Sequence, residues 1–181
     1  MKTKFLDPKD VEVALKEIAV KAEYSGCAVA LVGGVAMSLY GSDRMTRDVD
    51  FVCSSLGRED WLAKVDRRLK FGGVAGVTAS GCPVDLIFRT DDYAPLYEEA
   101  LHMAMPFEAL PVKVVSPEHL AALKMAAGRE KDELDLKTLI RLGVLHLETT
   151  EIILRRHLGV YAVREFKSLC DEVAWLKSRE D

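Results

Sequence analysis

Three acidic side chains in two apolar stretches have the types and spacing of a metal site. Asp48 and Asp50 are two residues apart in RDVDF, and Asp85 lies between Val84 and Leu86 in PVDLIF. Because side chains alternate along a strand, the acids face one side and their apolar neighbours the other. Carboxylates held so close repel one another unless a cation compensates them. We therefore predict that the three acids hold two Mg²⁺ ions, which require several oxygen ligands.

The residues just before the acidic pair suit phosphate binding. Gly33 and Gly34 follow a short apolar strand and open a short helix, so a phosphate can approach backbone N–H groups and the positive helix end. Arg44 and Thr46 alternate with the acidic pair along an extended segment, and the arginine can neutralise charge on a phosphoryl group. A Gly-Gly pair is also a common tight turn, and Asp-x-Asp is often a solvated strand end. The ordered set, with a third acid on another strand, favours the functional interpretation.

Hydrophobic periodicity and turn residues predict a mixed α/β portion followed by an all-helical portion. Asp7-Pro8 and Ser116-Pro117 are helix-start signals. Residues 58–70 have the helical spacing of an amphipathic helix, with Trp61, Leu62, Val65 and Leu69 on its apolar side. The remaining expected helices are 8–24, 35–40, 92–102, 117–127, 131–142, 149–158 and 162–177, and the expected extended segments are 28–32, 48–53, 74–79, 83–88 and 105–115. The segments 74–79 and 83–88 are expected to pair antiparallel.

Size and composition indicate a soluble globular protein. Of 181 residues, 49% are hydrophobic and 30% charged, which are ordinary values. The net charge of −4, from 25 basic and 29 acidic residues, argues against a protein whose main role is coating nucleic acid. With no run near the ~18 apolar residues of a membrane span and no apolar signal segment, we expect a cytoplasmic protein without a membrane partner. The widely spaced cysteines are expected to be buried free thiols: Cys27, Cys53, Cys82 and Cys170.

The two portions are expected to form one compact unit. No glycine- or serine-rich linker lies between residues 1–115, the α/β portion, and residues 116–181, the helical portion. Two layers that share a core without a linker are expected to face each other across a cleft.

The pattern of glycines and acids resembles the nucleotidyltransferase superfamily with the DNA polymerase beta fold. The pattern consists of Gly33-Gly34, thirteen intervening residues, Asp48-Val49-Asp50 and a later strand aspartate, Asp85. The segment Arg44-x-Thr46-x-Asp48-Val49-Asp50-Phe51 is similar to the branch of AbiEii-type toxins and small antibiotic nucleotidyltransferases. This resemblance implies an α/β (α+β) fold, with a mixed sheet flanked by helices and a C-terminal helical bundle packed across a cleft. It also implies that the three acids bind two Mg²⁺ ions and that the diglycine holds nucleotide phosphates.

A charged segment in the helical portion adds to this resemblance. LKMAAGREKDELDLKTL, residues 123–139, is similar to the segment that follows the catalytic core in AbiEii-like proteins. The match implies that Lys124 and Lys131 contact phosphates, that Arg129 orients the site, and that Asp132 is a candidate general base. The alternative is a solvated helix face, on which an ion pair between Lys131 and Asp135 is worth only ~0.3–0.5 kcal/mol.

The residues and the resemblance together predict a Mg-dependent nucleotidyltransferase. It is expected to transfer an NMP from an NTP to an acceptor hydroxyl on RNA or tRNA, a protein or a small molecule. The resemblance also implies a role as the toxin of a toxin–antitoxin pair, with an antitoxin protein as partner. The alternative is a non-catalytic nucleotide-binding or protein-interaction module on the same scaffold. The matched set of three acids and a diglycine argues against that alternative, because a binding module has no need of a metal triad.

Overall fold

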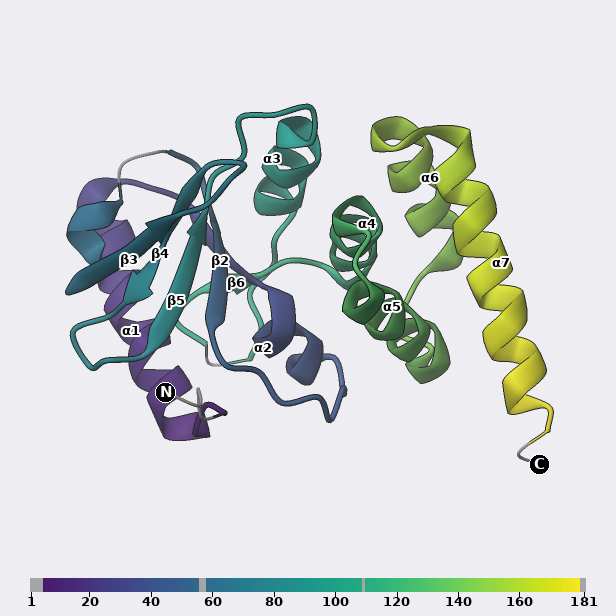
Figure 1. The fold of residues 1–181 in the computed structure, drawn as a ribbon, viewed down its shortest axis with the longest axis horizontal. Coiled ribbons are helices and arrows are strands. Elements are labelled where there is room, and N and C mark those ends of the chain that lie inside the picture. Colours follow the sequence, from purple (N-terminus) through teal and green to yellow (C-terminus); the bar gives the residue numbers. More distant parts are fainter. Residues whose placement is uncertain (1–4, 56–57, 109, 180–181) are drawn as a thin grey trace.

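The computed structural model describes residues 5–55, 58–108 and 110–179. Over these ranges the chain forms seven α-helices, six strands and one short 3₁₀ helix, in two portions that lie side by side (Figure 1). The first portion contains α1 (Pro8–Ser25), β1 (Val29–Val32), α2 (Gly33–Leu39), β2 (Val49–Cys53), the 3₁₀ helix (Glu59–Trp61), β3 (Lys64–Arg68), β4 (Gly73–Val77), β5 (Pro83–Ile87), α3 (Ala94–His102) and β6 (Lys113–Val114). The second contains α4 (Pro117–Ala127), α5 (Glu130–Leu142), α6 (Leu147–His157) and α7 (Gly159–Lys177). None of these helices is long and apolar enough to cross a membrane.

The strands of the described chain join one mixed sheet in the order β3-β4-β5-β2-β1-β6. β2 lies inside the sheet, antiparallel to β1 and parallel to β5. Asp50 of β2 lies opposite Val32 of β1 and opposite Asp85 of β5. Directly opposite residues project from the same face of a sheet, so the register brings two of the predicted acids together. The predicted pairing of β4 with β5 is also confirmed.

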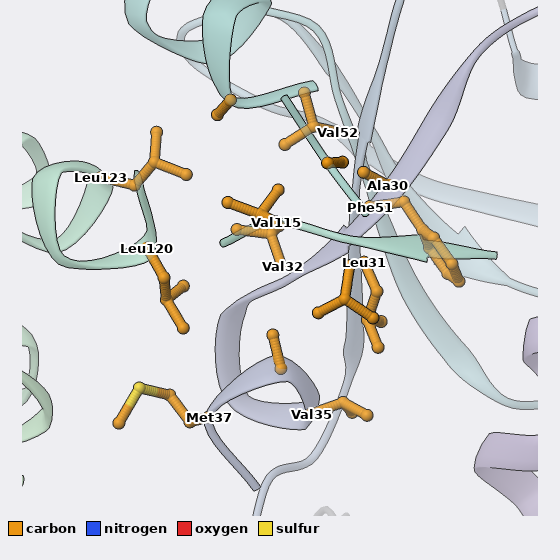
Figure 2. Close-up of a cluster of buried hydrophobic side chains, with 14 of the residues drawn as sticks. Ala30, Leu31, Val32, Val35, Met37, Phe51, Val52, Val115, Leu120 and Leu123 are labelled. Atoms are coloured by element: carbon orange, nitrogen blue, oxygen red, sulfur yellow. The ribbon is translucent and has the colours of Figure 1, made fainter. Parts of the chain in front are cut away.

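The face of β2 away from the acids is packed into the core. Val49 and Phe51 alternate with the acids and are both 0% exposed. They belong to a hydrophobic cluster that also contains Leu15 and Ile18 of α1. Figure 2 shows the part of this cluster where β1, β2, α2 and α4 meet. The cysteines are free thiols, as predicted, with Cys27, Cys53 and Cys82 buried and Cys170 half-buried.

Capping residues begin and end the helices where the sequence predicts. The Asp7 side chain accepts a hydrogen bond from the backbone N–H of Lys9 at 2.9 Å, and Pro8 is the first residue of α1. Ser116 caps α4 in the same way, by accepting from the N–H of His119 at 3.3 Å. Gly128 ends α4 in the left-handed conformation, which lets α5 start in a new direction.

The helix predicted over residues 58–70 is wrong. The chain instead forms the 3₁₀ helix and the edge strand β3, which pairs antiparallel with β4. All five β3 residues are exposed, and of the four apolar residues assigned to the helix face only Trp61 is buried. Backbone pairing with β4 prevails over the helical spacing, and the charged side chains of β3 protect the exposed sheet edge from other chains.

Polar contacts and one hydrophobic cluster join the two portions. Glu99 of α3 accepts hydrogen bonds at 2.8 Å from Arg156 of α6 and contacts the His157 ring nitrogen at the same distance. Nη1 of Arg44, in the first portion, also pairs with Oδ2 of Asp135 on α5. The buried cluster contains residues of both portions. The division into residues 1–115 and 116–181 stays a prediction.

Replacing Phe51 with alanine tests the placement of β2. We expect the free energy of unfolding to fall by about 3–5 kcal/mol, because the substitution removes burial and leaves a cavity. Urea unfolding followed by circular dichroism measures this change. Tyr24, which is 95% exposed, provides the control, since Tyr24→Ala is expected to change stability by no more than about 0.5 kcal/mol. A Phe51→Ala loss close to that of the control would contradict the buried position.

Candidate active site

The structure brings the three predicted acids together at one end of the sheet. Asp50 lies on β2, Asp85 lies beside it on β5, and Asp48 directly precedes β2. One carboxylate oxygen from each lies within 4.8 Å of the others. Three oxygens at this spacing form a donor set that suits a hard divalent cation such as Mg²⁺.

The electrostatics of the triad also fit a cation. Burial and the neighbouring carboxylates of Asp48 and Asp85 raise the pKa of Asp50 to about 7. Burial and Asp48 likewise raise the pKa of Asp85, with partial compensation from Arg67 and Lys131. Arg67 lies 3.5 Å from Asp85, but 63% of its side chain is exposed, so solvent weakens this ion pair. A divalent cation bound between the carboxylates would offset their mutual repulsion, which contributes to the raised pKa values.

The diglycine is required by the packing around the acids. Gly33 has φ +68°, and a Cβ at this position would lie 1.9 Å from Oδ2 of Asp50. A Cβ on Gly34 would lie 2.6 Å from Oγ1 of Thr46. The backbone of Gly34 also hydrogen-bonds to the Asp50 carboxylate. The two glycines therefore hold the β1–α2 turn against the triad, and their contact with nucleotide phosphates stays a prediction.

Thr46 and Arg44 reach the cleft from an irregular segment, because β2 begins only at Val49. They line the same cleft as the acids, as the alternation along this segment predicts. The Thr46 hydroxyl lies 3.2 Å from Oδ1 of Asp48 and 3.1 Å from its carbonyl oxygen, and so orients that acid. Nη1 of Arg44 binds Oδ2 of Asp135 on α5 at 2.5 Å.

A buried ion-pair network forms the opposite wall of the cleft. Nζ of Lys124, on α4, lies 3.1 Å from Oδ1 of Asp132 and 2.5 Å from Oδ2 of Asp135. Nε of Arg129 lies 2.6 Å from Oδ2 of Asp132. The side chains of both aspartates and of Lys124 are no more than 8% exposed. Each buried charge thus has a partner of opposite sign, which offsets the cost of removing it from water.

Asp135 is a site residue that the sequence analysis did not include among its candidates. Within the described chain it pairs with Arg44 and Lys124 rather than with Lys131. The available signal was the three-residue spacing from Asp132, which places both acids on one face of a helix. The identity of the partners depends on α4 and the segment before β2, which are distant in sequence.

Asp132 forms ion pairs with two basic side chains, Lys124 and Arg129. Burial alone would raise its pKa, but hydrogen bonds from Arg129 and Lys124 outweigh burial and lower the pKa. A carboxylate with a lowered pKa and both oxygens occupied is a weak proton acceptor. Its assignment as general base stays a prediction, and its contacts favour a role in holding Lys124 and Arg129.

One cleft of about 230 Å³ unites the triad and the cationic wall. Its lining contains all the residues that the sequence analysis singled out: Gly33, Gly34, Arg44, Thr46, Asp48, Asp50, Asp85, Lys124, Arg129, Lys131 and Asp132. Arg67 and Tyr97 line it as well and were not predicted. The cleft thus places oxygen ligands for cations opposite cationic groups that can bind phosphates.

Replacing Gly33 with alanine is expected to damage the metal site without unfolding the protein. The new Cβ would displace the Asp50 carboxylate, so Mg²⁺ or Mn²⁺ affinity measured by calorimetry should fall at least about tenfold. Gly26 has a similar φ of +64°, but a Cβ added there would meet nothing within 4 Å. Gly26→Ala therefore imposes the same backbone strain and should keep metal affinity. Equal affinities in the two variants would contradict this account of the diglycine.

Metal binding is expected to depend on pH through Asp50. Its folded-state pKa of about 7 lies above the ordinary 3.8, so the folded metal-free protein holds an extra proton between these values. Stability of that protein should fall as pH rises through this window and level off above it. Because a cation must displace the proton, saturating Mg²⁺ should raise Tm more near pH 8 than near pH 5. Scanning fluorimetry measures this, and an equal rise at both pH values would contradict it.

Comparison with known proteins finds one family similar to the first part of the chain. The family description "Nucleotidyl transferase AbiEii toxin, Type IV TA system" matches residues 14–85, a range that includes the diglycine and all three acids. No curated protein matched the sequence.

Two solved structures share the fold. An antigenic nucleotidyltransferase-like protein from Paracoccidioides brasiliensis aligns with a TM-score of 0.52 and 18% identity, covering 93% of this chain and 95% of that chain. A protein from H. pylori described as a nucleotidyltransferase aligns with a TM-score of 0.51 and 14% identity, covering 97% of this chain and 99% of that chain. Residues 14–85 are thus similar to the AbiEii nucleotidyltransferase family, and the chain shares its fold with two nucleotidyltransferase-like structures.

Proposed function

We propose that this protein transfers a nucleoside monophosphate from an NTP to a hydroxyl group of an acceptor and releases pyrophosphate. The observation that carries the proposal is the triad of carboxylates, within 4.8 Å of one another, in a cleft whose other wall is cationic. Acceptors compatible with this chemistry are an RNA or tRNA, a protein side chain or a small hydroxylated molecule. The AbiEii match supports a toxin–antitoxin setting, with an antitoxin protein as partner.

Asp48, Asp50 and Asp85 would hold the divalent cations. Two Mg²⁺ ions bound there would supply charge neutralisation at the phosphates and lower the pKa of the attacking hydroxyl. The protein's own contribution is to fix the carboxylates: Thr46 orients Asp48, and the Gly34 backbone hydrogen-bonds to Asp50. This preorganisation avoids the cost of rearranging the site during the reaction.

The cationic wall would bind the triphosphate. Arg44 and Lys124 are held in place by their shared partner Asp135, and the N-terminal end of α5 adds Arg129 and Lys131. Charge-assisted hydrogen bonds from such groups are stronger than neutral ones and can orient a phosphoryl group. Because Asp135 fixes two cations at once, its role is to position them.

Asp85 is the residue best suited to accept the proton of the acceptor hydroxyl. The Asp85 carboxylate lines the cleft and pairs with the largely exposed Arg67 at 3.5 Å, so a hydroxyl group in the cleft can approach it. Both oxygens of Asp132 instead accept hydrogen bonds, from Lys124 and Arg129. We therefore assign proton transfer to Asp85 and the holding of Lys124 and Arg129 to Asp132.

Replacing Asp50 with asparagine tests the function. We expect transfer of label from α-labelled NTPs to components of a whole-cell extract to fall at least about 100-fold. Asparagine has nearly the same volume as aspartate, so circular dichroism and Tm should show a folded protein. Asp92 is an exposed acid outside the cleft, and Asp92→Asn should retain full activity.

Separating the label into RNA, protein and small-molecule fractions would identify the acceptor class. A folded Asp50→Asn protein with wild-type incorporation would overturn the mechanism. Mg²⁺-dependent NTP binding by the wild type without incorporation into any fraction would instead indicate the non-catalytic binding module.

A further inference from the structure

A second cavity lies under α3 on the same face of the sheet as the triad. It has a volume of about 400 Å³, and we name it the α3 pocket. Its lining includes Val52, Ser54, Ala94, Tyr97, Leu101 and Lys113. The pocket shares Tyr97 with the catalytic cleft but contains none of the acids of the triad.

Strand register defines an axis that runs from α2 through the triad to this pocket. Gly33 follows Val32, which lies opposite Asp50, so α2 begins beyond the triad at one end. Val52 lies opposite Ile87 at the other end, on the same face as the acids because it is two residues further along β2. At about 3.3 Å per residue, the pocket residue Val52 lies roughly 7 Å further along β2 than Asp50.

In-line displacement gives the two ends of this axis different roles. The attacking and leaving oxygens lie on opposite sides of the transferred phosphorus. The diglycine begins α2, Thr46 lies against Gly34, and the Arg44 carbonyl oxygen accepts a hydrogen bond from Ser38 of α2. These residues are therefore on the α2 side of the triad, where the proposed triphosphate site places the leaving pyrophosphate. The acceptor oxygen must then approach from the other side, where Ile87 and Tyr97 lead to the α3 pocket.

Tyr97 links the two cavities. Its ring lies on the lining of both, and burial raises the pKa of its hydroxyl, with charge contributions from Arg89 in the pocket and from Arg129 and Asp50 in the cleft. The hydroxyl is therefore within electrostatic reach of both sites. An acceptor seated in the pocket would pass Tyr97 on its way to the triad.

Arg89 forms a fixed wall of the pocket. Its guanidinium binds both oxygens of Asp91, at 2.9 and 2.5 Å, and lies 4.1 Å from the ring centre of Phe71 and 5.0 Å from that of Tyr97. Only 10% of this side chain is exposed. These contacts hold the wall in place before any ligand binds, which reduces the entropic cost of binding.

The lining favours a planar ring without positive charge. Val52, Leu101 and Tyr97 provide apolar surface, and the lining also contains two basic side chains, Arg89 and Lys113, and one acid, Glu98. The excess of basic side chains disfavours cationic ligands. The apolar surface suits a heteroaromatic ring, and the basic side chains suit a phosphate group attached to that ring. We propose that the α3 pocket binds the nucleobase of a nucleotide acceptor; this inference rests on the proposed function.

Nucleotide binding to the full-length protein can be measured without turnover. Methyl NMR spectra are recorded while each of the four nucleoside 5′-monophosphates is added, with and without Mg²⁺ and a non-hydrolysable α,β-methylene NTP. We expect at least one monophosphate to shift the methyl signals of Val52 and Leu101, and to do so also when the NTP analogue is bound. Ala94→Phe fills the pocket and should weaken this binding at least about tenfold, while Mg²⁺-dependent binding of the NTP analogue is retained.

Ala174→Phe on α7 provides the matched control, because Ala174 is exposed and outside both cavities. It should bind the monophosphate as the wild type does. The proposal is overturned if no monophosphate binds, if only cleft methyls such as those of Leu120 and Leu123 shift, or if Ala94→Phe binds normally. It is also overturned if the NTP analogue alone occupies the pocket and displaces the monophosphate, which would assign the pocket to the NTP base. Failure of label transfer would refute the proposed function and leave this binding result unchanged.

Discussion

Mutual repulsion among three carboxylates is the constraint on which the arrangement of this protein depends. Asp48, Asp50 and Asp85 are held within 4.8 Å although burial and their own charges oppose it. The central strands hold the acids there through backbone pairing, and the apolar side of β2 is anchored in the core by Phe51 and Val49, both 0% exposed. The free energy of core packing thus supports a site that would be unfavourable by itself, as is common where structure serves chemistry.

The helical portion meets this negative charge with a positive wall that is also held in place. Lys124 is almost buried, and its two aspartate partners come from α5. One of these, Asp135, reaches across to Arg44 in the first portion. The ion pairs therefore position the cationic groups and at the same time fix α4 and α5 relative to the sheet. Glu99 adds a second polar connection, from α3 to α6.

Local sequence signals were sufficient for features that depend on nearby residues. The caps Asp7 and Ser116, the alternation around Asp50 and the strand position of Asp85 are local, and the structure places them as predicted. Features decided by distant partners were missed. β3 depends on pairing with β4, and its residues also have helical spacing, so periodicity alone favoured the wrong element.

The same limit applies to the site. Asp135 gains its importance from Arg44, 91 residues away in the chain. Tyr97 and the α3 pocket require α3 to fold over the sheet, which no local pattern specifies. The sequence patterns thus predicted the charged groups that line the cleft, whereas the residues that hold them and the second cavity required the three-dimensional structure.

The close approach of Gly33 to Asp50 couples the residues that the two positions can accept. A side chain at position 33 would occupy the space of the Asp50 carboxylate, so the acid adds a steric constraint to the one that the positive φ already imposes. A descendant that lost the acid would release the glycine from its steric constraint, leaving only the strain of a positive φ. In a relative that has lost the acid, a side chain at position 33 should therefore cost only this backbone strain, whereas beside an intact acid it must also displace the carboxylate.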